Sequence, residues 1–178
     1  MSRMKRSVKK EIAAFALVLA AVALQGRNAF AADVEINATN FPDEVFRSYV
    51  GDHFDSDKDG KLSEEEINAV REIDCSGTEK EPVGIASLQG VEFFDNLWRL
   101  DCDYNALSSL DLSTNTKVEY IECSDNQLTS IDVSGCKNLY SLILYRNKLR
   151  EIDLSHNTEL CYFGCYVNQL ETLLILLK

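Results

Sequence analysis

The sequence lacks the motifs that most enzymes need. Its 178 residues include two histidines, His53 and His156, and neither has a plausible nucleophile partner by motif. A glycine-rich phosphate loop, a Cys-x-x-Cys pair and an H-E-x-x-H helix are all absent. Paired carboxylates are frequent, but an acidic repeat produces such pairs without any catalytic role. We therefore predict no catalytic residues and no enzyme activity.

Positive charge is also scarce. The chain has 18 Lys and Arg against 29 Asp and Glu, which gives a net charge of −11. Six of those basic residues and one of the acidic residues lie within positions 1–31, so the remainder carries a net charge of −16. Such a surface repels nucleic acid and anionic lipid and favours a cation. We expect no nucleic-acid partner.

Long apolar runs are limited to the segment Ile12 to Leu24, and no other segment could span a membrane. Basic residues precede this run, and Ala29-Phe30-Ala31 follows it as an A-x-A cleavage site. This order predicts a secretory signal peptide over residues 1–31. The run is short for a membrane span, which needs about 20 residues; an uncleaved N-terminal anchor is the alternative. We expect a secreted or cell-surface protein with no membrane contact after cleavage.

The most prominent feature that is present is a repeat with a period of 21 residues. A fixed period of this length predicts a solenoid, in which each turn, here called a coil, buries its apolar side against the next. A degenerate first coil spans 73–96, where Ile73 and Cys75 match Leu100 and Cys102 at an offset of 27 residues. The leucine-rich repeats together span 73–178. The regular units begin at Leu97, Val118, Leu139 and Leu160.

Each regular unit predicts a short strand and a return segment. Residues 99–103 and their equivalents alternate in and out as a strand does. The return, such as 111–115, has no continuous helical pattern, so we expect extended or 3₁₀ backbone there and a mostly irregular or 3₁₀ convex side. An asparagine column should bond backbone groups that no sheet satisfies. Its members are Asn105, Asn126, Asn147 and Asn168.

Six cysteines in an exported chain would ordinarily suggest disulfides. Four of them fall in the inward column, where a thiol packs as a small hydrophobe. Cys136 shares the column of Asn115 and Asn157, and Cys161 flanks a strand. We expect reduced, buried thiols, with coil-to-coil bridges as the alternative. The inward cysteines are Cys75, Cys102, Cys123 and Cys165.

Residues 38–72 read as a small helical cap. The segment from Asn40 to Glu44 has a cap residue, an early proline and early carboxylates, which predict a helix that continues to about His53. A second helix is expected from about Ser63 to Glu72, and Ser63 with Glu66 forms a capping box at its start.

Between these helices, residues 55–66 fit D-x-D-x-D-G-x₅-E in full, and the segment looks like an EF-hand loop. Calcium takes six to eight oxygen ligands. We expect a single Ca²⁺ site that fixes the helix pair, since no second loop is visible; sensing is the less favoured role, and a solvated acidic loop is the alternative. The ligands are carboxylates from Asp55, Asp57 and Asp59, the Lys61 carbonyl, Ser63 through a water, and both oxygens of Glu66.

The repeat Leu97-x-x-Leu100-x-Cys102-x-x-Asn105-x-Leu107, copied from 118 and 139, resembles the leucine-rich repeat family. A cap of EF-hand character in front of such repeats is similar to the internalin arrangement. The resemblance covers residues 40–178. It implies an α/β fold, a curved solenoid with parallel strands on its concave face, which the family uses mostly to bind proteins.

The strand alternation names the outward positions of that concave face, which include Ser124 in the second coil and Gly164 in the fourth. They grade from charged residues in the first coil to tyrosines in the last, and tyrosine is a common anchor in protein interfaces. We expect a protein ligand, with a glycan as an alternative and tyrosines that are merely exposed as another. Trp98 could pack under the cap or contact a ligand. The expected ligand-binding residues are Tyr120, Glu122, Tyr145, Tyr162 and Tyr166.

The repeat pattern breaks down after Leu173. The sequence thus predicts a calcium-stabilised, exported leucine-rich repeat protein for protein binding or adhesion. The alternative is an N-terminal fragment of a larger surface adhesin or of a repeat-bearing secreted enzyme.

Overall fold

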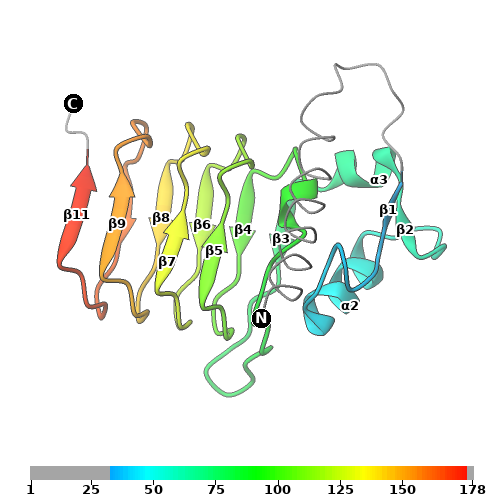
Figure 1. Cartoon of the computed structure of the whole chain (residues 1–178), viewed down its shortest axis with the longest axis horizontal. Helices are drawn as coiled ribbons and strands as arrows, with labels where there is room; N and C mark the ends of the chain where they lie inside the picture. The colour runs from blue at the N-terminus through cyan, green and yellow to red at the C-terminus, as the bar shows by residue number, and fades with distance from the viewer. Residues whose placement is uncertain (1–32, 176–178) are drawn as a thin grey trace, which may run out of the picture. The chain divides into compact units, whose positions relative to one another are not determined.

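The computed structural model describes residues 33–175, so the signal peptide expected at 1–31 lies outside the described residues. The described part is a helical segment followed by stacked coils (Figure 1). Its elements are β1 (Val34–Glu35), α2 (Glu44–His53), β2 (Lys61–Leu62), α3 (Glu64–Ala69), β3 (Glu72–Asp74), η1 (Val91–Phe93), β4 (Arg99–Asp101), β5 (Ser109–Asp111), β6 (Tyr120–Glu122), β7 (Ser130–Asp132), β8 (Ser141–Ile143), β9 (Glu151–Leu154), β10 (Tyr162–Gly164) and β11 (Thr172–Ile175).

The main sheet is parallel, with the order β10-β8-β6-β4-β3. Arg99 pairs with Tyr120 and Tyr120 with Ser141, so neighbouring strands are offset by the 21-residue repeat. β3 joins the sheet at the expected longer offset, with Ile73 opposite Leu100. The solenoid prediction is therefore confirmed.

The return side of the coils contains the extended backbone expected there, but it is more regular than the mostly irregular or 3₁₀ convex side that the sequence predicts. Its short strands pair in parallel, β5 with β7 and β9 with β11, while the 3₁₀ helix η1 precedes the first regular coil. The cause is local. Leu110 is buried between exposed neighbours, which suits an extended strand, and the Asp111 carboxylate then accepts a bond from the Ser113 amide at 2.9 Å and turns the chain.

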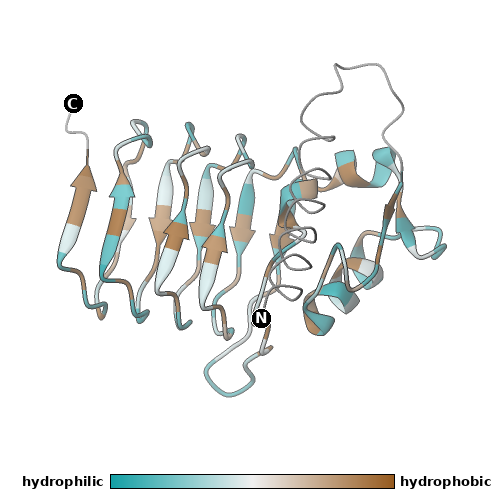
Figure 2. Ribbon diagram, in the orientation of Figure 1, coloured by the Kyte–Doolittle hydropathy of each residue, from teal (hydrophilic) through white to brown (hydrophobic). Residues whose placement is uncertain are grey.

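The core runs continuously through the coils. Leu97, Leu100, Leu107 and Leu112 of the first regular unit are fully buried, and their equivalents stack on them in the next two units. Figure 2 shows hydrophobic and hydrophilic residues alternating along the strands, whereas β11 is largely hydrophobic. Each coil thus buries its apolar side against its neighbours, as a solenoid requires.

Both helices differ from their predicted bounds. α2 begins after Asp43 rather than near Asn40, because the Asp43 carboxylate accepts bonds from the Val45 and Phe46 amides. α3 ends at Ala69, since Glu72–Asp74 is drawn into the sheet as β3. The predicted capping box between Ser63 and Glu66 is present.

Aromatic side chains join the helical segment to the first coil. Phe54 meets Phe94 edge to face at 5.3 Å between ring centroids, and Phe41 contacts Phe93 at 5.6 Å. The Asp43 carboxylate also accepts a bond from the Ala86 amide at 2.8 Å. These contacts cover the end of the apolar core that would otherwise face solvent.

Candidate binding face and calcium loop

The outward side chains of β4, β6, β8 and β10 form one surface, here called the binding face. Tyr120, Glu122 and Tyr145 are half-buried on it, whereas Tyr162 is 60 % exposed and Tyr166, just after β10, is 53 % exposed. All five expected ligand-binding residues therefore reach the surface. Two other positions expected to face outward, Ser124 and Gly164, are buried.

The two exceptions have local causes. The Ser124 amide donates a bond to the Asp103 carboxylate, which draws this residue inward where the strand ends. Gly164 is covered by the ring of Tyr145: a β-carbon added to Gly164 would lie 2.4 Å from Tyr145 Cε1. The glycine therefore makes room for a tyrosine of the neighbouring coil.

An aromatic ladder, defined here as Trp98, Tyr120, Tyr140 and Tyr162, crosses the sheet at the N-terminal ends of its strands. Successive ring centroids are 5.4, 5.8 and 5.4 Å apart. The sequence leaves Trp98 open between packing and contact, and strand alternation does not identify Tyr140 because that residue precedes its strand. The signal that could have found it is the 42-residue interval, two repeats, that separates Tyr140 from Trp98.

A second aromatic cluster lies beyond the opposite ends of these strands. Tyr145 and Tyr166 have ring centroids 4.2 Å apart. Arg146 donates to the Tyr166 hydroxyl at 2.6 Å and forms an ion pair with Asp125. Hydrogen bonding to Asp125 raises the pKa of Arg146, so its guanidinium stays charged.

Charge on the binding face concentrates in the first coils. Arg99 bonds Asp101 at 2.8 Å and Glu122 at 3.0 Å, so one cation serves two carboxylates. Hydrogen bonding to Asp101 is the main cause of the raised pKa of Arg99. Asp103 is half-buried, and desolvation raises the pKa of its carboxyl. This end of the face is left acidic.

The predicted calcium loop has three carboxylates close together. Oxygens of Asp55, Asp57 and Asp59 lie within 4.8 Å of one another. Asp55 is buried and accepts bonds from the Asp59 and Gly60 amides, which fold the loop around it. Gly60 has a φ of +83°, a conformation that favours glycine. This set of oxygens fits a hard cation such as Ca²⁺.

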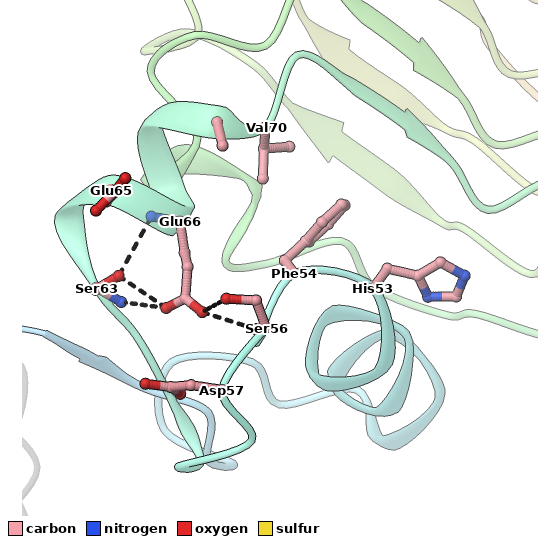
Figure 3. Close-up of a pocket in the computed structure, with 9 residues that line it drawn as sticks. His53, Phe54, Ser56, Asp57, Ser63, Glu65, Glu66 and Val70 are labelled. Carbon is pink, nitrogen blue, oxygen red and sulfur yellow. Dashed lines mark hydrogen bonds between the residues drawn. The ribbon is translucent and has the colours of Figure 1, made fainter.

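Glu66, the last predicted ligand, is not part of that group. Figure 3 shows its carboxylate between Ser56 and Ser63. One oxygen accepts from the amide and hydroxyl of Ser56 at 2.7 Å, and the other accepts from Ser63. These bonds, led by that from the Ser56 hydroxyl, lower the pKa of Glu66 to about 2. Glu66 therefore closes the loop onto the start of α3.

The remaining two predicted ligands lie along β2 and the start of α3. Lys61 pairs with Glu35 of β1 in an antiparallel ladder, and its amide donates to the Asp59 carboxylate at 2.8 Å. Ser63 is the N-cap of α3. A pocket beside the loop is lined by apolar Phe54 and Val70 and by the polar groups of Ser56 and Glu66 (Figure 3).

The stacked parallel strands, the buried leucine columns and the asparagine column define a leucine-rich repeat solenoid of about four coils. The chain is similar to internalin J of Listeria monocytogenes, with 37 % identity over 76 residues, which are 43 % of this chain and 8 % of that protein. No family model matches the chain.

Two solved structures of Listeria monocytogenes proteins share the fold. The functional domain of internalin J, described as including a cysteine ladder, matches with a TM-score of 0.70 and 32 % identity, over 80 % of this chain and 30 % of that one. An internalin C2 matches with a TM-score of 0.53 and 21 % identity, over 83 % and 80 % of the respective chains. This chain thus spans less than a third of the internalin J domain and a small part of the whole protein.

Within residues 33–175, no helix has the length and apolar character needed to cross a bilayer.

Proposed function

We propose that this protein is exported and binds a protein partner through the binding face, without a catalytic step. The observation that carries the proposal is the set of exposed tyrosines on a hydrogen-bonded sheet, of which Tyr162 and Tyr166 are more than half exposed. Tyrosine offers a large contact area and a hydroxyl at a low cost in conformational entropy. The likeness to internalin J supports adhesion or protein binding.

The rigidity of the sheet supports the same proposal. Strand contacts hold the backbone of each coil to the next, and Tyr145 is packed over Gly164 before any partner arrives. A preorganised surface loses little freedom on binding, so more of the contact energy appears as affinity. A flexible loop carrying the same tyrosines would bind more weakly.

The binding proposal is tested with the double variant Tyr145→Ala, Tyr166→Ala. Protein purified from the medium of an expressing strain is screened by interferometry against an array of extracellular proteins, and Kd is measured for each hit. We expect the double variant to weaken binding by at least about tenfold. The control is Val83→Ala, an exposed apolar residue in the loop before η1. Undiminished binding by the double variant would contradict the proposal.

We also propose that the loop from Asp55 to Glu66 holds Ca²⁺, which stabilises the helical segment. The residues would serve as expected from the sequence: three aspartates, the Lys61 carbonyl, Ser63 through a water, and Glu66. The bound ion would offset the mutual repulsion of the three aspartates and cross-link the loop to α3. Support comes from the spacing of the aspartate oxygens and the bonds that fold the loop around Asp55.

Calcium dependence is tested by thermal unfolding with calcium and with chelator. At a calcium concentration about 100-fold above Kd, the melting temperature should rise by roughly 5–10 °C. Glu66→Gln should reduce this rise, whereas Glu65→Gln, its neighbour in the first turn of α3, should keep it. Loss of the capping box should lower the melting temperature equally with calcium and with chelator. The difference in melting temperature between the two conditions therefore reports calcium binding alone. Identical unfolding in calcium and chelator would refute the proposed site.

A further inference from the structure

The aromatic ladder has a regular spacing that suggests a particular class of partner. Tyr120 and Tyr162 occupy the same strand position two coils apart, since Tyr120 pairs with Ser141 and Ser141 with Tyr162. Neighbouring strands lie about 4.8 Å apart, so the two tyrosines are separated by about 9.6 Å along the stack. Trp98 and Tyr140 occupy the repeat position one residue before that of Tyr120 and Tyr162, and they are separated by the same interval.

This interval matches one turn of a polyproline II helix. That helix has three residues per turn and rises about 3.1 Å per residue, so every third side chain recurs after about 9.3 Å. A proline-rich segment laid along the stack would place a proline against Tyr120 and the next in register against Tyr162. Aromatic grooves are a recurring way to recognise this conformation, because its backbone is already ordered.

The tilts of the rings favour a proline-rich peptide over a glycan. Trp98 and Tyr120 are inclined by 89°, Tyr120 and Tyr140 by 53°, and Tyr140 and Tyr162 by 68°. Rings inclined in this way present edges as well as faces to the surface, and compact proline rings can pack against both. A sugar chain would need ring faces that lie open and parallel. The hydroxyl of exposed Tyr162 can donate to a carbonyl of a polyproline II backbone, which has no internal hydrogen bonds.

Charge beside the ladder suggests a basic residue in the partner. Arg99 is shared between Asp101 and Glu122, and the Glu122 side chain is 44 % exposed. Glu119 occupies the column of Trp98 and Tyr140, one coil from each, and is half-buried. Arg99 can neutralise only one of the two carboxylates that it contacts. The half of the ladder nearest Trp98 therefore has one unneutralised carboxylate beside it, in addition to that of Glu119.

We propose that the aromatic ladder binds a proline-rich polypeptide segment in the polyproline II conformation, with a basic residue near its Trp98 end. This inference rests on the proposed function and names its class of partner. It uses Trp98, Tyr120, Tyr140 and Tyr162, whereas the test of the proposed function uses Tyr145 and Tyr166. The two can therefore fail separately.

The test uses two fluorescent peptides of roughly 12 residues with identical composition and one terminal arginine. The first carries proline at every third position, and the second carries the same prolines at alternating spacings of two and four. Fluorescence anisotropy measures the affinity of each for protein purified from the medium. The periodic peptide should bind at least about fivefold more tightly.

Variants locate the bound peptide. Tyr120→Ala and Tyr162→Ala should each weaken binding of the periodic peptide by about fivefold or more, while Val83→Ala leaves it unchanged. Glu122→Gln should reduce the salt dependence of binding, and Glu151→Gln, an exposed glutamate on the return strand β9, should not. An unchanged melting temperature shows that each variant folds.

Three results would overturn the inference. The first is equal affinity for the two peptides or no binding of either. The second is binding of the periodic peptide that is insensitive to Tyr120→Ala and Tyr162→Ala. The third is binding of a β-linked glucose oligomer, lost in those variants, without binding of the periodic peptide, which would assign the ladder to glycans. If Tyr145→Ala, Tyr166→Ala weakens capture of a protein while any of these three results is obtained with the peptides, the proposed function stands and the ladder inference fails.

Discussion

At the scale of single residues, the asparagine column shows why one polar residue recurs in an apolar core. The side-chain oxygen of Asn147 accepts a bond from the Leu128 amide at 2.9 Å, and its nitrogen donates to the Cys123 carbonyl at 2.8 Å. Both partners belong to the preceding coil, where the strand has ended. The column therefore satisfies buried backbone groups that the sheet ladder leaves unpaired.

Asn147→Ala should accordingly be strongly destabilising. It leaves a buried amide and a buried carbonyl without partners, at about 1–3 kcal/mol each, so we expect a loss of about 2–6 kcal/mol in the free energy of unfolding. Urea unfolding measures this loss. Asn168→Ala is the matched control, because Asn168 makes the equivalent bonds to Leu149 and Leu144 but is only half-buried. An equal or larger loss at Asn168 would contradict the argument.

Gly164 is a second residue whose identity is set by a neighbour. No positive φ requires glycine there, but the ring of Tyr145 occupies the space of its missing side chain. Gly164→Ala should displace that ring and separate it from Tyr166. Tyrosine fluorescence should change, and protein binding should weaken by about fivefold or more in Kd. The fold should persist. Gly51→Ala is the control, since its added carbon would meet only Ile36 at 3.9 Å.

At the scale of elements, β1 pairs with the predicted calcium loop. The short strand β1 lies antiparallel to β2, and the Ile36 amide donates to the Gly60 carbonyl at 3.0 Å. EF-hand loops usually occur in pairs, and the sequence pattern that resembles such a loop occurs once in this chain. We infer that β1 supports this loop from the side where a second loop would lie.

Ile36→Pro tests that support. Proline removes the amide that bonds Gly60, and a hydrogen bond contributes about 0.5–1.5 kcal/mol, so calcium affinity should fall about two- to tenfold. Isothermal titration with calcium measures the change. Ile36→Ala removes side-chain packing but keeps the amide, so it should retain more of the affinity. If wild-type protein binds no calcium, the site itself is disproved; equal effects of the two variants would disprove only the role of β1.

The elements also show what the sequence could predict. Strand positions followed from the spacing of Leu100, Ile121 and Leu142, because an inward column with a fixed period has one consistent register. The end of α3 could not be read locally, since pairing of Glu72–Asp74 with β4 is a contact between distant residues. Local alternation likewise placed Gly164 outward, where only the ring of Tyr145 from another coil covers it.

The predicted calcium loop and the binding face also differ in how much of each could be predicted from the sequence. The aspartates of the predicted calcium loop were identifiable because their spacing is continuous in sequence, and their oxygens do come together. The position of Glu66 was not, since its carboxylate is held by Ser56, ten residues away. On the binding face, the five expected residues reach the surface, but the contacts that organise them into a ladder and a cluster arise between coils.

At the scale of the whole molecule, the thiols form part of the core that joins the coils. All six cysteines are free, and Cys75, Cys102 and Cys123 lie buried in one inward column. Cys136 donates to the Leu112 and Asn115 carbonyls at 3.4 and 3.5 Å. These are the positions that Asn157 bonds one coil later, at Val133 and Cys136, so the thiol takes the place of an asparagine.

If these thiols are reduced, their accessibility should divide them into two groups. Exposed Cys161 and half-buried Cys165 should react with Ellman's reagent in the native protein, Cys165 more slowly because desolvation raises its pKa, and the four buried cysteines should react only on unfolding. In denaturant without reductant, all six should titrate. A count below six there would show that coil-to-coil bridges have formed in the exported protein.

The same burial predicts a loss of stability at alkaline pH. Desolvation raises the pKa of Cys75 and of Cys136 from 9.0 to about 12, because the thiolate is disfavoured in the core. The folded state therefore binds more protons than the unfolded state between those values. The stabilising contribution is complete below pH 9 and is lost as the pH rises toward about 12. Cys136→Asn should fold, since asparagine suits this column, and should lose less stability over that range in thermal unfolding. A variant with the same alkaline loss as wild type would assign that loss to other groups.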